Sequence, residues 1–302
     1  MRAAVSGATG FIGKRLLEQL TRPVVLTRDP RRAASTLGNI EAHAWDPIAG
    51  PPPLEALRGL DAVFHLAGDP VADGRWTEEK KCRIRDSRVL GTRHLVESLS
   101  RLPQDERPKV LVSASAVGYY GDRGDDLLTE DASPASDFLA EVCQAWERES
   151  QAAATLGIRV VNPRTGIVLG AGGGALAKML LPFRLGLGGR LGSGRQWMPW
   201  IHLHDEVGLL LHAAGRDDVS GPLNATAPQP VTNREFTATL ARVLHRPAWL
   251  PVPVLALKLA TGDFAEVLIA SQRVVPAVAE RSGYAFKFPQ LQGALESILA
   301  SG

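Results

Sequence analysis

The chain has 302 residues, 45% of them hydrophobic and 22% charged. These are the values of an ordinary globular protein and exclude a disordered or coiled-coil chain. The 34 Lys and Arg residues nearly balance the 32 Asp and Glu residues, so net charge gives no reason to expect a nucleic-acid or membrane partner. Two cysteines cannot form a disulfide framework and fit a reducing compartment. Because we find no run of apolar residues that suits a membrane span or a secretory leader, we expect a cytoplasmic protein.

Short strand-like runs alternate with longer helical patterns through the first two-thirds of the chain. This alternation predicts βαβ units and therefore an α/β fold with a parallel sheet. The predicted strands are residues 3–6, 24–26, 62–66, 110–112 and 158–161, and the predicted helices are residues 11–20, 76–100 and 136–156.

The composition of the chain changes after Arg164, where glycines become frequent. We expect mostly loops over residues 165–200, with one helix near residues 175–185. Residues 221–226 could return a strand to the sheet, and the proline-rich last 70 or so residues suit a smaller lobe. We therefore predict a main domain over residues 1–170, completed by the returning strand, and a lobe formed mainly by residues 171–302.

A glycine-rich turn joins the first predicted strand to the first predicted helix. It reads Gly7-Ala8-Thr9-Gly10-Phe11-Ile12-Gly13. Gly7 permits a tight turn, Gly10 lets the backbone approach a pyrophosphate, and Gly13 lets the helix pack closely on the strand. The turn therefore predicts a dinucleotide-binding loop, and the alternative is a plain turn between strand and helix.

The residues after the second predicted strand bear on the choice between NAD and NADP. An NAD site usually places an acidic residue about 20 residues beyond the glycine loop, to bind the ribose hydroxyls. This chain has Thr27 and Arg28 there, with Asp29 only after them. A guanidinium offers a planar set of donors that suits a 2′-phosphate. The pattern favours NADP(H), and the alternative is a solvated basic loop.

Several stretches together resemble the extended short-chain dehydrogenase/reductase superfamily. They are the glycine loop, Leu66-Ala67-Gly68, residues 113–121, residues 162–170, Trp200-Ile201-His202 and the C-terminal run from Ser271 to Pro289. Within that superfamily the chain is similar to the atypical epimerase-like family, whose members are often called nucleoside-diphosphate-sugar epimerases. The resemblance covers nearly the whole chain. It implies a Rossmann-type, doubly wound parallel sheet that carries NADP(H), with a smaller C-terminal lobe that closes a cleft over a small-molecule substrate.

The resemblance also implies which residues hold the cofactor, from the pyrophosphate at the glycine loop to the nicotinamide. One position departs from the pattern, because Arg88 stands before Gly91-Thr92 where the superfamily normally has Asn. The implied cofactor-binding residues are Gly7, Thr9, Gly10, Phe11, Ile12, Gly13, Arg28, Leu66, Ala67, Gly68, Ser113, Pro163, Arg164 and Gly166.

The helix predicted over residues 136–156 lacks the catalytic pair of the superfamily. That pair is a Tyr and a Lys four residues apart, in which the Lys lowers the pKa of the phenol. Here the corresponding pair is Phe138 with Val142 or Leu139 with Cys143, depending on the register. The usual proton relay is therefore absent from these positions.

Ser115 and Tyr119 are the remaining candidates for catalysis, because they lie on the loop expected to face the nicotinamide. Their alternatives are a hydroxyl that stabilises the turn and a ring that packs against the loop. Glu141 and Glu147 lie on the helix predicted over residues 136–156, which we call the relay helix. Glu141 could act in acid–base chemistry if it is half-buried, although a Glu on a helix is more often solvated. Cys143 is expected to be a core thiol.

The stretch from Trp200 to Asp205 contains further candidates. Trp200 and His202 could contact the substrate, although a Trp can equally fill the core. His202 and His204 could share one face of a strand, but no third ligand stands out, so we expect no metal site. Asp205 is expected to cap the helix that follows. Arg164 could bind an anion in the cleft or form a structural ion pair.

Two functions follow from these observations. The first is an NADP(H)-dependent oxidoreductase or epimerase-like enzyme that acts on a small polar substrate without the Tyr-x-x-x-Lys relay. The second is a non-catalytic NADP(H)-binding sensor or scaffold, which the missing relay favours. The sequence names neither the substrate nor the oligomeric state.

Overall fold

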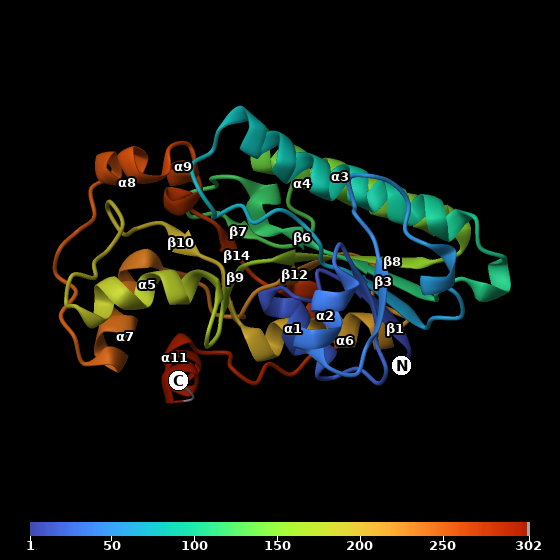
Figure 1. The fold of residues 1–302 in the computed structure, drawn as a ribbon. Helices are drawn as coiled ribbons and strands as arrows, with labels where there is room; N and C mark the ends of the chain where they lie inside the picture. Colours follow the sequence, from blue (N-terminus) through green and yellow to red (C-terminus); the bar gives the residue numbers. More distant parts are fainter. Residues whose placement is uncertain (301–302) are drawn as a thin grey trace.

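The computed structural model describes residues 1–300, which form a central parallel sheet between two layers of helices, with a smaller helical region at one end (Figure 1). The main sheet contains β1 (Ala3–Ser6), β2 (Val24–Thr27), β3 (Glu41–Ala44), β4 (Ala62–His65), β5 (Val110–Ser113), β6 (Ser115–Ala116), β8 (Arg159–Thr165) and β12 (Gly221–Ala225). The helices that cover it are α1 (Phe11–Leu17), α2 (Pro30–Leu37), α3 (Glu78–Ser100), α4 (Phe138–Gln151) and α6 (Leu203–Gly215).

The strand order places the candidate site. It runs β12-β8-β5-β4-β1-β2-β3, with every neighbouring pair parallel and β6 added beside β8. The chain moves outward in one direction from β1 to β3 and in the other from β4 to β12, so the order reverses between β1 and β4. Ligands of such sheets bind beyond the carboxyl ends of the strands at this reversal. The predicted Rossmann-type α/β fold is confirmed.

The two faces of the sheet differ in chemistry. The face under α1 and α6 is apolar, with Val5, Phe64 and Val112 fully buried against α6 side chains such as Leu209. The other face lies under α3 and α4 (Figure 1), and its core gives way to buried polar side chains toward the carboxyl ends of the strands. This polar end of the α3–α4 face is where the candidate catalytic residues gather.

A second core lies beyond the sheet. Buried side chains that include Leu176, Phe236 and Leu295 hold α5, α7 and α11 together. The elements of this region are α5 (Gly174–Arg184), α7 (Asn233–Leu244), α8 (Val254–Thr261), α9 (Phe264–Ile269), α10 (Ala277–Arg281) and α11 (Leu291–Ala300), with β9 (Ile167–Leu169) beside β11 (Trp200–His202), β10 (Trp197–Met198) beside β13 (Val231–Thr232), and β14 (Arg273–Val274) beside β7 (Leu127–Leu128).

Some elements differ from the sequence prediction. The prediction omitted α2 and β3, and β3 shows no buried apolar alternation, because none of its residues is fully buried. Asp205 does not cap α6, so that prediction was wrong. The cap is His202, whose Nδ1 accepts a hydrogen bond from the backbone of His204, whereas Asp205 accepts from the backbone N–H groups of Lys287 and Phe288. No helix within residues 1–300 is long and apolar enough to cross a membrane.

Candidate functional site

The glycine loop between β1 and α1 (residues 7–13), called the glycine cradle below, has no room for a side chain at Gly7 or Gly13. Gly7 has a φ of 71°, and a Cβ added to it would lie 2.8 Å from the carbonyl carbon of Leu66. A Cβ added to Gly13 would lie 2.3 Å from the carbonyl oxygen of Gly7. Gly10 closes the turn with a 2.9 Å hydrogen bond to the same oxygen. Only glycine therefore fits at residues 7 and 13, and the chain keeps bare backbone at the carboxyl end of β1, as a bound pyrophosphate would require.

Arg28 follows β2 and is exposed, without a hydrogen bond or ion pair to another residue in the described part of the chain. The neighbouring acid is engaged, because Asp29 caps α2 by accepting a 3.0 Å hydrogen bond from the backbone of Arg32. The Arg28 guanidinium, and not the Asp29 carboxylate, is thus available to bind a ligand at the end of β2. This arrangement suits a 2′-phosphate better than ribose hydroxyls.

A row of buried polar side chains crosses the carboxyl end of the sheet on the α3–α4 face. Ser6, His65 and Ser113 are paired across β1, β4 and β5. The Ser6 hydroxyl lies 2.7 Å from His65 Nδ1, and Asn162 Nδ2 donates to the Ser113 carbonyl. Within residues 1–300, His65 Nε2 and the fully buried Ser113 hydroxyl have no hydrogen-bond partner. Burial lowers the pKa of His65 to about 4, so the ring is neutral near pH 7.

Glu147 of α4 lies next to this row and holds two other predicted site residues. The Ser115 hydroxyl donates a 2.6 Å hydrogen bond to Glu147 Oε1. Arg164 of β8 donates to both carboxylate oxygens, at 2.9 Å each. The Arg164 side chain is 3% exposed and that of Glu147 13%. Burial alone would lower the pKa of Arg164, but the ion pair with Glu147 holds it above its ordinary value.

Two tyrosines complete the surroundings of Arg164. Tyr119 places its ring 3.4 Å from the Arg164 guanidinium carbon, and Tyr120 accepts a 3.0 Å hydrogen bond from Arg164 Nη1. The Tyr120 hydroxyl donates in turn to Asn224 of β12, and burial raises the pKa of Tyr120 to about 12. Tyr120 is therefore a buried structural phenol, whereas Tyr119 is only half-buried. The Arg164 guanidinium thus combines a buried ion pair with Glu147 and a hydrogen bond to Tyr120.

The register of the missing relay follows from the contacts of α4. Residues 113–121, which start at the end of β5, form what we call the serine loop. A Cβ added to Gly118 on this loop would lie 3.2 Å from Leu139 Cβ and 3.9 Å from Cys143 Sγ, so these two side chains face the loop. Phe138 instead packs against Trp76, with ring centroids 5.5 Å apart. Burial raises the pKa of Cys143 to about 12. The two positions that face the loop thus carry an apolar side chain and a neutral thiol.

The two predicted substrate contacts have structural roles in this fold. Trp200 is 0% exposed and donates to the carbonyl of Gln229, so its ring packs in the core of this structure. His202 stacks on Phe288 with ring centroids 3.9 Å apart, and burial lowers the pKa of His202 to about 4. Residues 1–300 contain no group of three or more His, Cys, Asp or Glu side chains that could hold a metal.

A buried carboxyl lies on the opposite face of the sheet, where the sequence predicted only the start of a helix. Glu206 of α6 is 1% exposed and accepts a 2.9 Å hydrogen bond from Thr165. Its second oxygen has no partner in the described residues. Burial raises the pKa of Glu206 to about 8, although the Thr165 hydroxyl acts against this shift. A carboxyl in such surroundings is mostly protonated near pH 7.

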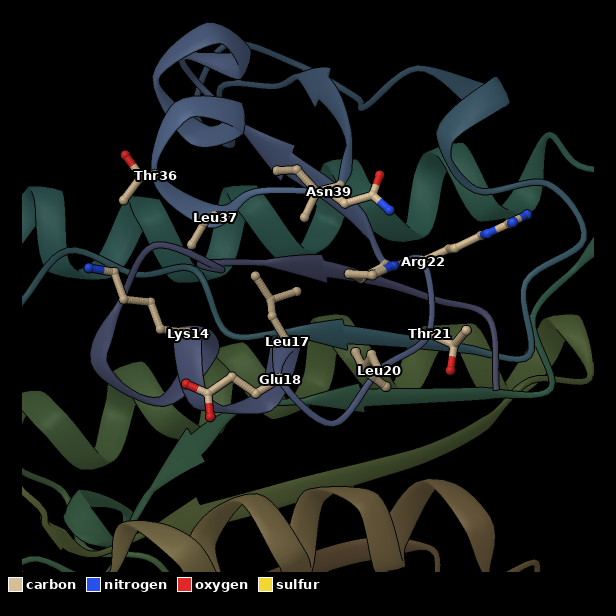
Figure 2. Close-up of a pocket in the computed structure, with 11 residues that line it drawn as sticks. Lys14, Leu17, Glu18, Leu20, Thr21, Arg22, Thr36, Leu37 and Asn39 are labelled. Atoms are coloured by element: carbon tan, nitrogen blue, oxygen red, sulfur yellow. The ribbon is translucent and has the colours of Figure 1, made fainter.

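One hollow on the protein lies away from these residues. It has a volume of about 650 Å³ and runs between α1 and α2, next to the amino ends of β2 and β3 (Figure 2). Because ligands of parallel sheets bind at the carboxyl ends, we do not assign the site there. A second hollow of about 430 Å³ brings Gly124 and Asp125, which follow the serine loop, against Arg195 and Val254 of the C-terminal region.

Comparisons with known proteins agree with this arrangement. The NAD dependent epimerase/dehydratase family matches residues 3–225, and a domain of unknown function, DUF1731, matches residues 252–298. The epimerase family protein YfhF of Bacillus subtilis is 39% identical over 305 residues, which cover 99% of this chain and 98% of that protein. A chloroplastic SDR39U1 homologue of Arabidopsis thaliana is 40% identical over 99% of this chain and 87% of its own length.

A solved structure extends the likeness to three dimensions. The crystal structure of human epimerase family protein SDR39U1 (isoform 2) with NADPH has a TM-score of 0.88 and 34% identity to this chain, over the whole of both chains. The resemblance noted in the sequence is therefore confirmed. This chain belongs to the NAD dependent epimerase/dehydratase family.

Proposed function

We propose that the protein is an NADP(H)-dependent oxidoreductase or epimerase-like enzyme that acts on a small polar substrate without a Tyr-x-x-x-Lys relay. The observation that carries the proposal is the glycine cradle at the carboxyl end of β1, with the unpaired Arg28 at the end of β2. The human relative crystallised with NADPH supports the same cofactor here. We further propose that residues 1–170 and β12 bind the cofactor, that residues 171–302 mainly bind the substrate, and that the protein is cytoplasmic.

The residues proposed to hold the cofactor surround the carboxyl ends of β1, β2, β4, β5 and β8. Bound nicotinamide would accept or donate a hydride. Bare backbone at Gly7 and Gly13 leaves space for the pyrophosphate, and Arg28 would bind the 2′-phosphate. Ser113 at the end of β5 would lie beside the nicotinamide, and residues 163–166 at the end of β8 would pass under it.

We propose Ser115 and Tyr119 as the groups that handle the proton. Ser115 would accept a hydrogen bond from a substrate hydroxyl and pass its own proton to Glu147, 2.6 Å away. In the reverse direction the same proton returns through Ser115 to a substrate carbonyl oxygen. Arg164 holds the Glu147 carboxylate in place and stacks on Tyr119, so the ion pair would position both candidates.

A second function has its own support. Leu139 and Cys143 at the relay positions cannot exchange a proton at neutral pH, because one is apolar and burial raises the pKa of the other to about 12. A protein that binds NADP(H) as a sensor or scaffold needs no such exchange. If Ser115→Ala and Tyr119→Phe both left a reductase activity unchanged, these two residues would have no catalytic role.

Calorimetric titration with NADPH and NADH tests the cofactor assignment. We expect NADPH to bind at least tenfold more tightly than NADH, on the order of the energy of one charge-assisted contact. Arg28→Ala should remove that preference, while Arg31→Ala, a nearby exposed arginine, should leave it unchanged. Equal affinities for the two cofactors, or a preference that survives Arg28→Ala, would contradict the assignment.

A further inference from the structure

We propose that Arg88 makes the cofactor site select the reduced form, NADPH, over the oxidised form, NADP⁺. This inference rests on the proposed NADP(H) site and assigns its redox preference to one side chain. Arg88 is one of the positions where the sequence departs from the superfamily, and the function proposed above makes no use of it.

Arg88 lies between the loop after β4 and the helix that lacks the relay. From α3 its Nη1 donates to the carbonyl oxygens of Asp69 and Ile84, at 3.0 Å each. A Cβ added to Gly68 would lie 3.1 Å from the Arg88 guanidinium carbon. The guanidinium also lies 5.1 Å from the ring centroid of Trp146 on α4. The guanidinium therefore contacts the loop after β4, whose Gly68 is proposed to bind the cofactor, and it also faces α4, the helix that lacks the relay.

No carboxylate forms an ion pair with this cation within residues 1–300. Asp86, two residues away, pairs with Arg85. Asp69 attracts Arg88 electrostatically, but its side chain pairs with Lys80, a buried lysine of α3. Glu147 on the relay helix is paired with Arg164. Arg88 itself forms hydrogen bonds only to carbonyl oxygens and has no ion pair in the described residues.

The Cys143 thiol also lies close enough to Arg88 to affect the pKa of Arg88. This thiol is neutral near pH 7, because burial raises its own pKa to about 12. Burial lowers the pKa of Arg88, but a guanidinium stays protonated in proteins. The neighbouring ion pairs Asp69–Lys80 and Glu147–Arg164 are each neutral overall, so Arg88 stays a cation without a paired carboxylate among the described residues. A half-buried charge of this kind is screened much less by salt than an exposed one.

An uncompensated cation distinguishes the two forms of the cofactor. The oxidised nicotinamide ring carries a positive charge and the reduced ring carries none, while the phosphates of the two forms are the same. With an effective dielectric constant of about 20, unit charges within roughly 10 Å of each other change an affinity at least tenfold. Repulsion by Arg88 should therefore weaken NADP⁺ binding and leave NADPH binding unopposed.

The test is the ratio of the NADP⁺ and NADPH dissociation constants, measured by calorimetry on the full chain at constant ionic strength. Contacts that both forms share cancel in this ratio, so a general loss of binding does not imitate the effect. We expect a ratio of at least about ten for the unaltered protein and for Arg88→Lys, which keeps the charge. Arg88→Gln should lower the ratio by about tenfold, mainly through tighter NADP⁺ binding. Arg93→Gln, which removes an exposed arginine of the same helix, should leave the ratio unchanged.

Each outcome is distinct. A ratio near one in the unaltered protein overturns the inference without any variant. The inference can therefore be refuted even if the Arg88→Gln protein does not fold. A ratio that stays high in a folded Arg88→Gln protein overturns it as well. If neither form binds the unaltered protein, the proposed function itself fails, and that result differs from binding without preference.

Discussion

Two parts of the candidate site differ in whether backbone or side chains form them. The glycine loop at residues 7–13 is made of backbone, and its shape depends on the absence of side chains at Gly7 and Gly13. The network around Glu147 is made of side chains from separate elements, with Ser115 from β6 and Arg164 from β8. The difference shows how family membership can coexist with altered chemistry, because the backbone cradle remains while the side chains beside it differ from the usual relay.

The largest effect is expected from filling the cradle. Gly13→Ala would place a Cβ 2.3 Å from the Gly7 carbonyl oxygen and 2.8 Å from Ala8 Cα. Because both contacts are to backbone, the loop must move, and we expect a loss of about 4 kcal/mol or more in the free energy of unfolding. Urea denaturation followed by circular dichroism measures this loss. Gly50→Ala is the matched control, since its added Cβ meets nothing within 4 Å, and a similar loss in that variant would contradict the steric argument.

The next effect concerns the network built of side chains. Glu147→Gln keeps the shape of the side chain but leaves Arg164 buried without its counter-charge, which should cost about 3 kcal/mol of unfolding free energy. Glu149→Gln on the same helix removes an ion pair whose arginine, Arg93, is 56% exposed. That variant should change the free energy of unfolding by less than about 1 kcal/mol. Equal losses in the two variants would mean that the Glu147 pair has no special role in stability.

A more gradual effect, spread over several pH units, should appear in the pH dependence of stability. The pKa of Glu206 is about 8 in the folded protein and near its ordinary value of 4.5 in the unfolded chain. Between these values the folded state binds more protons, so the contribution of Glu206 is fully present below the unfolded pKa and is lost as pH rises toward 8. The loss is at most about 1.4 kcal/mol per pH unit.

Glu206→Gln should remove this contribution. Unfolding free energies measured from pH 5 to pH 8 should therefore fall less steeply in the variant than in the unaltered protein. The variant should also gain stability relative to the unaltered protein as pH rises. Parallel curves for the two proteins would show that Glu206 does not titrate as its burial implies.

The sequence predicted the backbone-built part of the molecule well, because its signals are contiguous. A strand, a glycine turn and a helix follow one another within the first 20 residues, and steric rules assign each glycine a task. The alternation of strands and helices likewise predicted the parallel sheet. The strand β3 was missed because its short run, Glu41–Ala44, has no buried apolar face.

The side-chain part was harder to predict, because it depends on which residues the sheet register brings together. Glu147 and Arg164 lie 17 positions apart and meet only after α4 has packed on β8. Nothing local distinguishes Glu147 from a solvated helix carboxylate. Arg88 was noticed only as a departure from the superfamily pattern, and its contacts with Gly68 and Trp146 required the packing of α3.

Hydrogen–deuterium exchange with and without NADPH tests the central claim most directly. If the glycine cradle binds the cofactor, NADPH should slow amide exchange in residues 7–13 and around Arg28. Exchange should stay unchanged in residues 20–23, which line the large hollow between α1 and α2 (Figure 2). Protection of that hollow with no change at residues 7–13, or no protection anywhere at saturating NADPH, would contradict the account.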